Sequence, residues 1–269
     1  MELDVKGTSL TFQFYHARDN SIVSFAKDAE KEENRLFVPD EQSGFEEVIV
    51  DDDGEACFAT YGAIIPFDVE RIDKEGKIVN ETYFRVDRCG IMIFRDAVLM
   101  SGRPAAQREA AEALSTMLMK EVTPIKFDQA VMSRFETNFI LIKSIQLDEI
   151  PHAEVKKVRL AGKIEDVYAF SGLNVSMAKI KSISGTYRLA DRDYVTVKTA
   201  DGGKLTIFRK KGKGIEVEVI RYFKDFILTP TAMMAGRGGA AAESGGDDDQ
   251  DDVRTDGVTE YTDVKGDWE

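Results

Sequence analysis

Residues 90–104 read GIMIFRDAVLMSGRP, and this stretch decides the predicted fold. Two short apolar runs flank the polar pair at 95–96, which is the pattern of a tight β-hairpin. Ser101 offers a side-chain oxygen to the free amides of a helix start, and Pro104 fits the first turn of a helix. We therefore expect a hairpin that is followed directly by a helix.

The segment after Pro104 predicts how this helix packs. Its apolar residues recur at three-to-four spacing, namely Ala110, Ala111, Leu114, Met117, Leu118 and Val122. This spacing places them on one face of a helix. We expect that face to fold back onto the hairpin and be buried on the sheet. No residue in this unit forms a catalytic signature.

The rest of the chain is rich in strand patterns. Alternating or extended segments predict strands at 10–15, 45–50, 56–67, 82–86, 139–147, 155–160, 167–170, 183–188, 194–199 and 205–209. Short helices are expected at 127–135 and 173–180, while 215–228 fits both a strand and a helix. The predicted class is α+β, with twisted antiparallel sheet or sheets and two or three packed helices.

Residues 194–228 have the same order of parts as 90–120. Each contains a strand, a tight turn, a strand, a glycine-containing link and an amphipathic element. Two interpretations stay open. The chain holds two copies of a ββα unit, or the order is a coincidence in a β-rich chain, because residue identity between the copies is poor.

The order Ile93-Phe94, turn, Val98, Ser101-Gly102 and helix resembles half of a TATA-binding-protein-type repeat. The resemblance covers about one unit of the chain and rests on generic features. It implies a twisted antiparallel sheet that carries helices on one face and meets nucleic acid with the other.

Composition narrows the class of protein. The chain has 269 residues and is 43% hydrophobic, enough to bury the core of one large domain or two small ones. No apolar run approaches the roughly 20 residues of a membrane span, and the start lacks a secretory signal pattern. Cys57 and Cys89 are not part of a CxxC pair. We expect them to be small apolar fillers in a protein of the reducing cytoplasm, without a membrane.

The net charge of −13 is unevenly distributed. Residues 1–140 hold 16 basic and 27 acidic side chains, and residues 141–230 hold 17 basic and 11 acidic ones. Residues 231–269 hold 3 basic and 11 acidic side chains. A basic segment is therefore followed directly by an acidic tail.

We predict three regions. Residues 1–122 form an α+β region that ends in the ββα unit, and residues 123–230 form a β-rich, basic α+β region. Residues 231–269 combine a glycine-rich linker with an acidic tail that includes the block at 247–252. Such a segment buries too little apolar area to offset its ordering entropy, so we expect it to be disordered.

Sites for chemistry are scarce in the sequence. His16 and His152 have no partners at metal-ligand spacing, and no GxSxG, Walker A or GxGxxG motif occurs. Asp51, Asp53 and Glu55 form either a Ca²⁺ or Mg²⁺ site or, as we favour, a solvated turn. We therefore predict no catalytic residue, no metal and no cofactor, and a protein that is not an enzyme.

A basic segment near the C-terminal end of the body is the candidate binding site. Its cations are Lys204, Arg209, Lys210, Lys211, Lys213, Arg221 and Lys224, with Phe208 and Tyr222 among them. Cations engage phosphates, and exposed aromatic rings stack on bases. The alternative is a solvated hairpin tip whose lysines prevent pairing between sheet edges.

The body, the tether and an acidic end that closes on Asp267-Trp268-Glu269 are similar in layout to many single-stranded-DNA-binding proteins. That resemblance implies a tail that competes with nucleic acid and recruits protein partners. We predict a non-enzymatic nucleic-acid-binding protein, for single strands before duplexes, whose oligomeric state is open. The alternative is a protein–protein adaptor or assembly component that does not bind nucleic acid.

Overall fold

The chain divides into two units, Met1–Thr229 and Pro230–Glu269. The computed structural model describes residues 2–3, 8–17, 25, 37–39, 41–51, 53–72, 74–152, 154–164, 177–189, 193–208 and 213–229. All of them lie in the first unit. The predicted tail, the predicted strand at 167–170 and the first half of the predicted helix at 173–180 lie outside the described residues. The end of that predicted helix is wrong, because Lys179 and Ile180 begin a strand.

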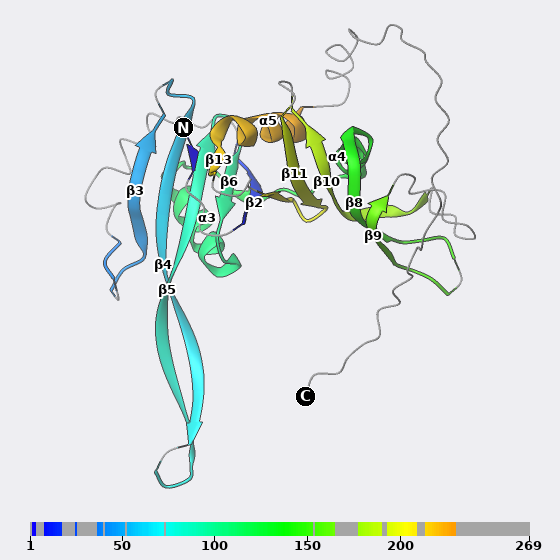
Figure 1. Cartoon of the computed structure of the whole chain (residues 1–269). Coiled ribbons are helices and arrows are strands. Elements are labelled where there is room, and N and C mark those ends of the chain that lie inside the picture. The colour runs from blue at the N-terminus through cyan, green and yellow to red at the C-terminus, as the bar shows by residue number, and fades with distance from the viewer. Residues whose placement is uncertain are drawn as a thin grey trace, which may run out of the picture. The chain divides into compact units, whose positions relative to one another are not determined.

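The first unit is α+β, with one large antiparallel sheet and three helices in its described part, which confirms the predicted class (Figure 1). The strands are β1 (Glu2–Leu3), β2 (Ser9–His16), β3 (Gly44–Val50), β4 (Ala56–Ile72), β5 (Ile78–Phe94), β6 (Val98–Ser101), β7 (Thr123–Pro124), β8 (Phe139–Asp148), β9 (Val158–Ile164), β10 (Lys179–Arg188), β11 (Tyr194–Ala200), β12 (Lys204–Phe208) and β13 (Ile215–Glu216). The helices are α3 (Pro104–Met117), α4 (Gln129–Asn138) and α5 (Val217–Leu228).

The strand order joins the two halves of the chain in one sheet. It runs β3-β4-β5-β6-β2-β12-β11-β10-β8-β9, with β7 also paired to β2, while β1 and β13 form a separate pair. The N-terminal strand β2 lies between β6 and β12, so it connects the predicted regions 1–122 and 123–230 through backbone hydrogen bonds.

The predicted hairpin and helix are present. The end of β5 pairs with β6, from Gly90 opposite Ser101 to Ile93 opposite Val98, and α3 begins at Pro104. The predicted cap is wrong: Arg103 caps α3 without a side-chain hydrogen bond. Ser101 is still part of the strand ladder, where its hydroxyl donates to the Gly90 carbonyl at 3.3 Å, so it lies too early in the chain to cap the helix.

Helix α3 buries its apolar stripe on one face of the sheet, as predicted. Ala106, Ala110 and Leu114 pack in a cluster with apolar residues of β4, β5 and β6. Cys57 and Cys89 belong to the same cluster, and both are free and buried. Burial raises the pKa of each thiol to about 12, so the two cysteines act as apolar fillers.

Helices α4 and α5 pack on the opposite face. An aromatic cluster joins them to β8 and β10, and its members are Phe135, Phe139, Tyr187, Phe223 and Phe226. In β2, Tyr15 belongs to the α3 cluster, whereas its neighbour Phe14 packs on Phe127, just before α4, with ring centroids 5.4 Å apart. Because successive strand residues point to opposite faces, α3 lies on one face and the other two helices on the other. The TATA-binding-protein resemblance implied helices on one face only.

The structure decides one open prediction of element type and corrects the predicted length of two strands. Residues 215–228, which fitted both patterns, form the two-residue strand β13 and then α5. Strands β4 and β5 are 17 residues each, longer than the predicted 56–67 and 82–86. In their outer part most side chains on both faces of the two-strand ribbon meet solvent, so no buried apolar stripe marks these residues in the sequence.

Candidate nucleic-acid interface

One face of the second half of the sheet is not covered by any of the described helices. On β10, β11 and β12, the residues Ile183, Val197, Leu205 and Ile207 are buried on the side of α4 and α5. Their strand neighbours point the other way, and helix α3 packs on β4 and β5. We name this second surface the open face. Its side chains come from Thr11, Lys143, Ser144, Gln146, Arg159, Ser182, Ser184, Thr186, Arg188, Tyr194, Thr196, Lys198, Lys204, Thr206 and Phe208.

The strand register places the open-face side chains side by side. Ser184 lies opposite Lys198, and Lys198 lies opposite Thr206. One step along, Thr186 lies opposite Thr196, and Thr196 lies opposite Phe208. Residues directly opposite in an antiparallel pair share a face, so these rows cross β10, β11 and β12 on one surface.

The open face is basic. Its cations are Lys143, Arg159, Arg188, Lys198 and Lys204, and the strand register adds one acidic residue, Asp148, at the end of β8. Lys198 and Lys204 are diagonal neighbours on adjacent strands, at a Cα separation of about 7–8 Å. Lys143 reaches across β10, where its ammonium donates to the Thr196 hydroxyl at 3.0 Å. Positive charge therefore spreads over several strands of one surface.

Two exposed aromatic rings lie at one end of this face. Tyr194 is 51% exposed and Phe208 is 37% exposed. Phe208 pairs with Thr196, two residues from Tyr194, so the rings are diagonal neighbours on β11 and β12. Arg188 lies directly opposite Tyr194. Two aromatic rings and a guanidinium are thus gathered at one corner.

Small hydroxyl side chains fill the space between the cations. Ser144 and Ser184 form a hydrogen bond of 2.8 Å across β8 and β10. Thr11 and Thr206 form another of 2.8 Å across β2 and β12. Short side chains keep the face shallow, and each hydroxyl both donates and accepts hydrogen bonds.

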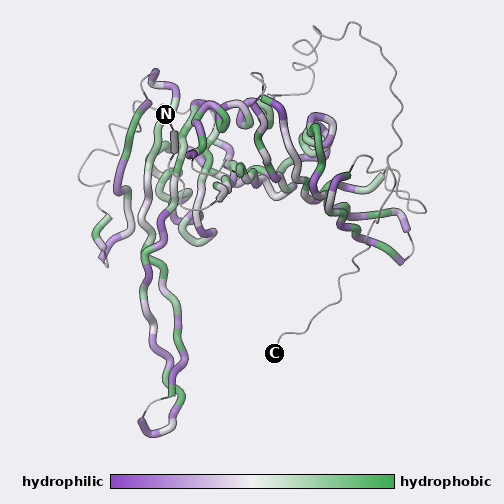
Figure 2. The backbone as a smooth tube through the Cα atoms, in the orientation of Figure 1, coloured by the Kyte–Doolittle hydropathy of each residue, from purple (hydrophilic) through white to green (hydrophobic). Residues whose placement is uncertain are grey.

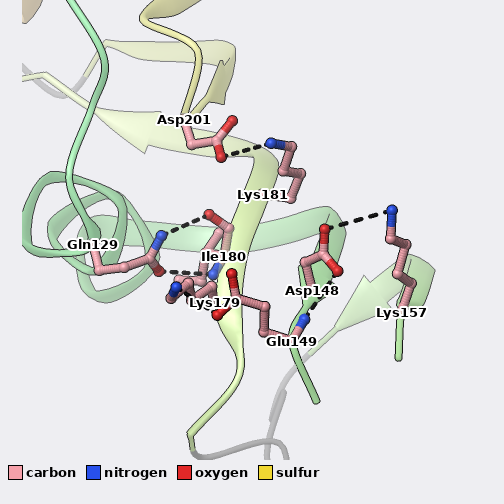
Figure 3. A network of polar contacts seen from close by, with 8 residues as sticks. All are labelled: Gln129, Asp148, Glu149, Lys157, Lys179, Ile180, Lys181 and Asp201. Carbon is pink, nitrogen blue, oxygen red and sulfur yellow. Dashed lines mark hydrogen bonds and ion pairs between the residues drawn. The ribbon is translucent and has the colours of Figure 1, made fainter. Parts of the chain in front are cut away.

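Acidic residues gather where β8 ends, where β10 begins and beyond the end of β11, and each is paired with a lysine (Figure 3). Lys181 binds Asp201 at 2.8 Å, and Lys157 lies 3.6 Å from Asp148. The hydrogen bond to Asp201 raises the pKa of the Lys181 ammonium. These pairs place the carboxylates at one end of the open face and neutralise them there.

The seven predicted cations are divided by the structure. Lys204 lies exposed on the open face, and Lys213 is exposed just before β13. The three cations Arg209, Lys210 and Lys211 follow Phe208 directly in the sequence and lie outside the described residues.

Arg221 and Lys224 belong to α5, on the opposite side of the sheet from Lys204. The Arg221 guanidinium donates to Asp51 and Asp53 in the turn before β4. The Lys224 ammonium lies 2.8 Å from Asp96 and 5.2 Å from the ring centroid of Phe94. These contacts dock α5 on the first half of the sheet. That the two residues bind nucleic acid stays a prediction.

The carboxylates of the turn at 51–55 have protein partners. Asp51 accepts a hydrogen bond from the Ala56 amide at 2.9 Å and also binds Arg221. Asp53 is 3.2 Å from the same guanidinium. Across the described residues, no group of three or more His, Cys, Asp or Glu side chains is arranged to hold a metal ion.

Sequence analysis did not identify most of the open-face cations, because they lie on four strands that are distant in the chain. The signal that could have found them is the alternation of apolar and polar residues along these strands. Residues 194–200 and 204–208 alternate apolar positions with lysine, threonine or an aromatic residue, and 180–188 alternates in the same way with serine and threonine. That alternation indicates a sheet face that is polar but not acidic.

No family model matches the chain, and no curated protein matches it significantly. Among the helices of the described residues, none combines the length and the apolar character that a membrane crossing needs.

Proposed function

We propose that this protein binds single-stranded nucleic acid on the open face. The observation that carries the proposal is the joint presence there of five cations and two exposed aromatic rings, while the carboxylates Asp148 and Asp201 lie at one end of the face and are paired with lysines. Lysine and arginine pair with phosphates and release counterions, while aromatic rings stack on unpaired bases.

The shape of the face favours single strands over duplexes. Six strands, from β9 to β2, contribute to it, which is about 24 Å at the usual strand spacing. Single-strand sites cover about 4–16 nucleotides for each domain. A duplex hides the faces of its bases, so Tyr194 and Phe208 would contact them only after the strands separate. We also propose that the protein acts in the reducing cytoplasm, which fits two free cysteines.

Removing the ring of Tyr194 is expected to weaken binding by about fivefold or more, since stacking contributes about 1–3 kcal/mol for each base. The measurement is fluorescence anisotropy of a labelled oligothymidylate with wild type and Tyr194→Ser. Phe84→Ser is the matched control, because Phe84 is also an exposed ring but lies on the outer part of β5. Equal losses in both variants would argue against stacking on the open face.

The second candidate is a protein–protein adaptor that does not bind nucleic acid. Two observations favour it: the acidic composition of 231–269 and the exposed apolar residues on the outer part of β4 and β5. If the protein is an adaptor, a pull-down recovers the same partner with and without nuclease treatment, and the purified protein does not bind oligonucleotides. Binding of the oligothymidylate would separate the two candidates.

A further inference from the structure

Among the described residues, no further strand pairs with the outer part of β4 and β5. Strand β3 pairs with β4 only as far as Gly62, and β6 pairs with β5 only as far as Gly90. Beyond these points the two strands pair with each other alone, to Ile72 opposite Ile78. We name residues 64–86 the arm, and Figure 1 shows it leaving the sheet as a two-stranded ribbon. An isolated two-stranded ribbon is only marginally stable in water, so an arm of this length favours a partner.

Hydrophobic residues occur along the arm (Figure 2), and several of their side chains are exposed. On one face, Phe67 and Tyr83 lie opposite each other with ring centroids 6.0 Å apart, and they are 38% and 44% exposed. Ile65 and Val69 flank Phe67 on the same face, where Val69 is 38% exposed and Ile65 is partly buried against the α3 cluster. We name this surface the Phe67–Tyr83 face. Exposed apolar residues gathered on one face are typical of an interaction surface.

The charges on the Phe67–Tyr83 face are arranged symmetrically about its centre. On β5, Glu81 and Arg85 lie two residues before and after Tyr83, so one acidic and one basic group stand at equal distances from the ring. On β4, Ile65 and Val69 flank Phe67 in the same way. A surface of this kind is complementary to itself after a two-fold rotation.

We propose that the arm binds the arm of a second copy of this chain, face to face and antiparallel, about a two-fold axis at the Phe67–Tyr83 pair. Arg85 of each copy then meets Glu81 of the other, and Ile65 meets Val69. Two β-sheets packed face to face cross at about 30°, so we expect the two arms to cross at a similar angle.

The charge balance of the arm fits this partner better than nucleic acid. Residues 64–86 hold four basic and five acidic side chains, so their mutual repulsion is small although the chain carries −13. The acidic excess also disfavours phosphates. Arg71 already binds Glu81 at 3.0 Å, and Arg85 binds Asp87 at 3.0 Å. In the proposed dimer, the contacts between Arg85 and Glu81 of the two copies join these ion pairs into networks.

The available area suits a dimer of moderate affinity. An aromatic side chain has about 150–250 Å² of surface, and Phe67 and Tyr83, at 38% and 44% exposure, each offer less than half of it beside the neighbouring aliphatic residues. A stable interface buries about 800 Å² on each partner. The arm approaches this area only when most of its length is covered, as in the antiparallel arrangement.

The test is a charge swap measured by analytical ultracentrifugation of the full chain over a concentration series. Arg85→Glu alone and Glu81→Arg alone each place like charges at both contacts. We therefore expect the dimerisation affinity of each variant to fall about tenfold or more. In a mixture of the two variants, every contact between positions 81 and 85 joins opposite charges, so the mixed dimer forms as well as the wild type. Ile49→Ser, an exposed apolar residue on β3, is the control and keeps the wild-type behaviour.

Melting curves of each variant check that the body is folded, since Arg85 and Glu81 lie on the arm and outside the buried core. A wild type that stays monomeric at every concentration would overturn the proposal. So would a dimer that neither single variant weakens, or a mixture that fails to restore it. Oligonucleotide binding is a separate measurement, so this outcome does not decide the proposed function.

Discussion

Changing Lys143, Lys198 and Lys204 together to glutamate is expected to weaken binding to single-stranded nucleic acid by about a hundredfold or more at low salt. Each lysine that pairs with a phosphate contributes about 0.7 to the slope of log K against log salt for a single strand, so the slope should fall by about 2. The three residues lie on β8, β11 and β12. Lys198 lies opposite Ser184 and Thr206, and Lys204 lies opposite Ala200 and Gln13. Their replacement leaves the buried face of the sheet unchanged.

The measurement is oligonucleotide anisotropy across a salt series, with a variant of equal charge as the control. Lys74→Glu/Lys77→Glu/Arg108→Glu changes the net charge by the same amount, at exposed positions on the arm turn and α3. We expect the control to keep most of the affinity and the wild-type slope. If both triple variants lose affinity equally, overall charge and not the open face explains binding.

Cutting the chain after Pro230 is expected to raise the affinity for polyanions about tenfold at low salt. Residues 231–269 carry 11 acidic and 3 basic side chains on a glycine-rich tether, and the open face is basic. A short tether holds such a segment at an effective concentration of millimolar order. At physiological salt the screening length is about 8 Å, so the effect should shrink as salt rises.

The cut should leave the first unit folded. Arg134 of α4 donates to the carbonyls of Ile227 and Thr229, at 3.2 Å and 2.7 Å, and so fixes the end of α5 before the cut. The comparison is thermal melting and heparin binding of 1–230 against 1–269. A full-length chain with neutral residues at 247–252 is the control and should bind in the same way as 1–230. Unchanged affinity would leave the tail as a solubiliser or a partner site, and loss of cooperative melting would show that the folded unit needs the tail.

Local pattern predicted most of the elements of the fold. The hairpin at 90–100 and the stripe of α3 were correct because each depends on residues close in sequence. The cap at Ser101 was wrong because its strand pairing with Gly90 decides its hydrogen bond. The faces on which the helices lie also depend on pairing between distant strands, as the opposite directions of Phe14 and Tyr15 show. No local pattern contains that information.

The candidate site was only partly predictable for the same reason. A run of cations in sequence suggested that Lys204, Arg221 and Lys224 act together. The structure places the last two on α5, in ion pairs with Asp51, Asp53 and Asp96, because a helix that packs on a sheet brings its residues to the far side. Lys143 and Lys198 join Lys204 through strand register instead.

Lysine acetylation of the full chain, read by mass spectrometry with and without a saturating oligothymidylate, tests the open face most directly. We expect the oligonucleotide to protect Lys143, Lys198 and Lys204, while Lys74 on the arm turn reacts equally in both samples. Binding of the oligonucleotide without protection of these three lysines, or with protection confined to lysines away from the open face, would contradict this expectation.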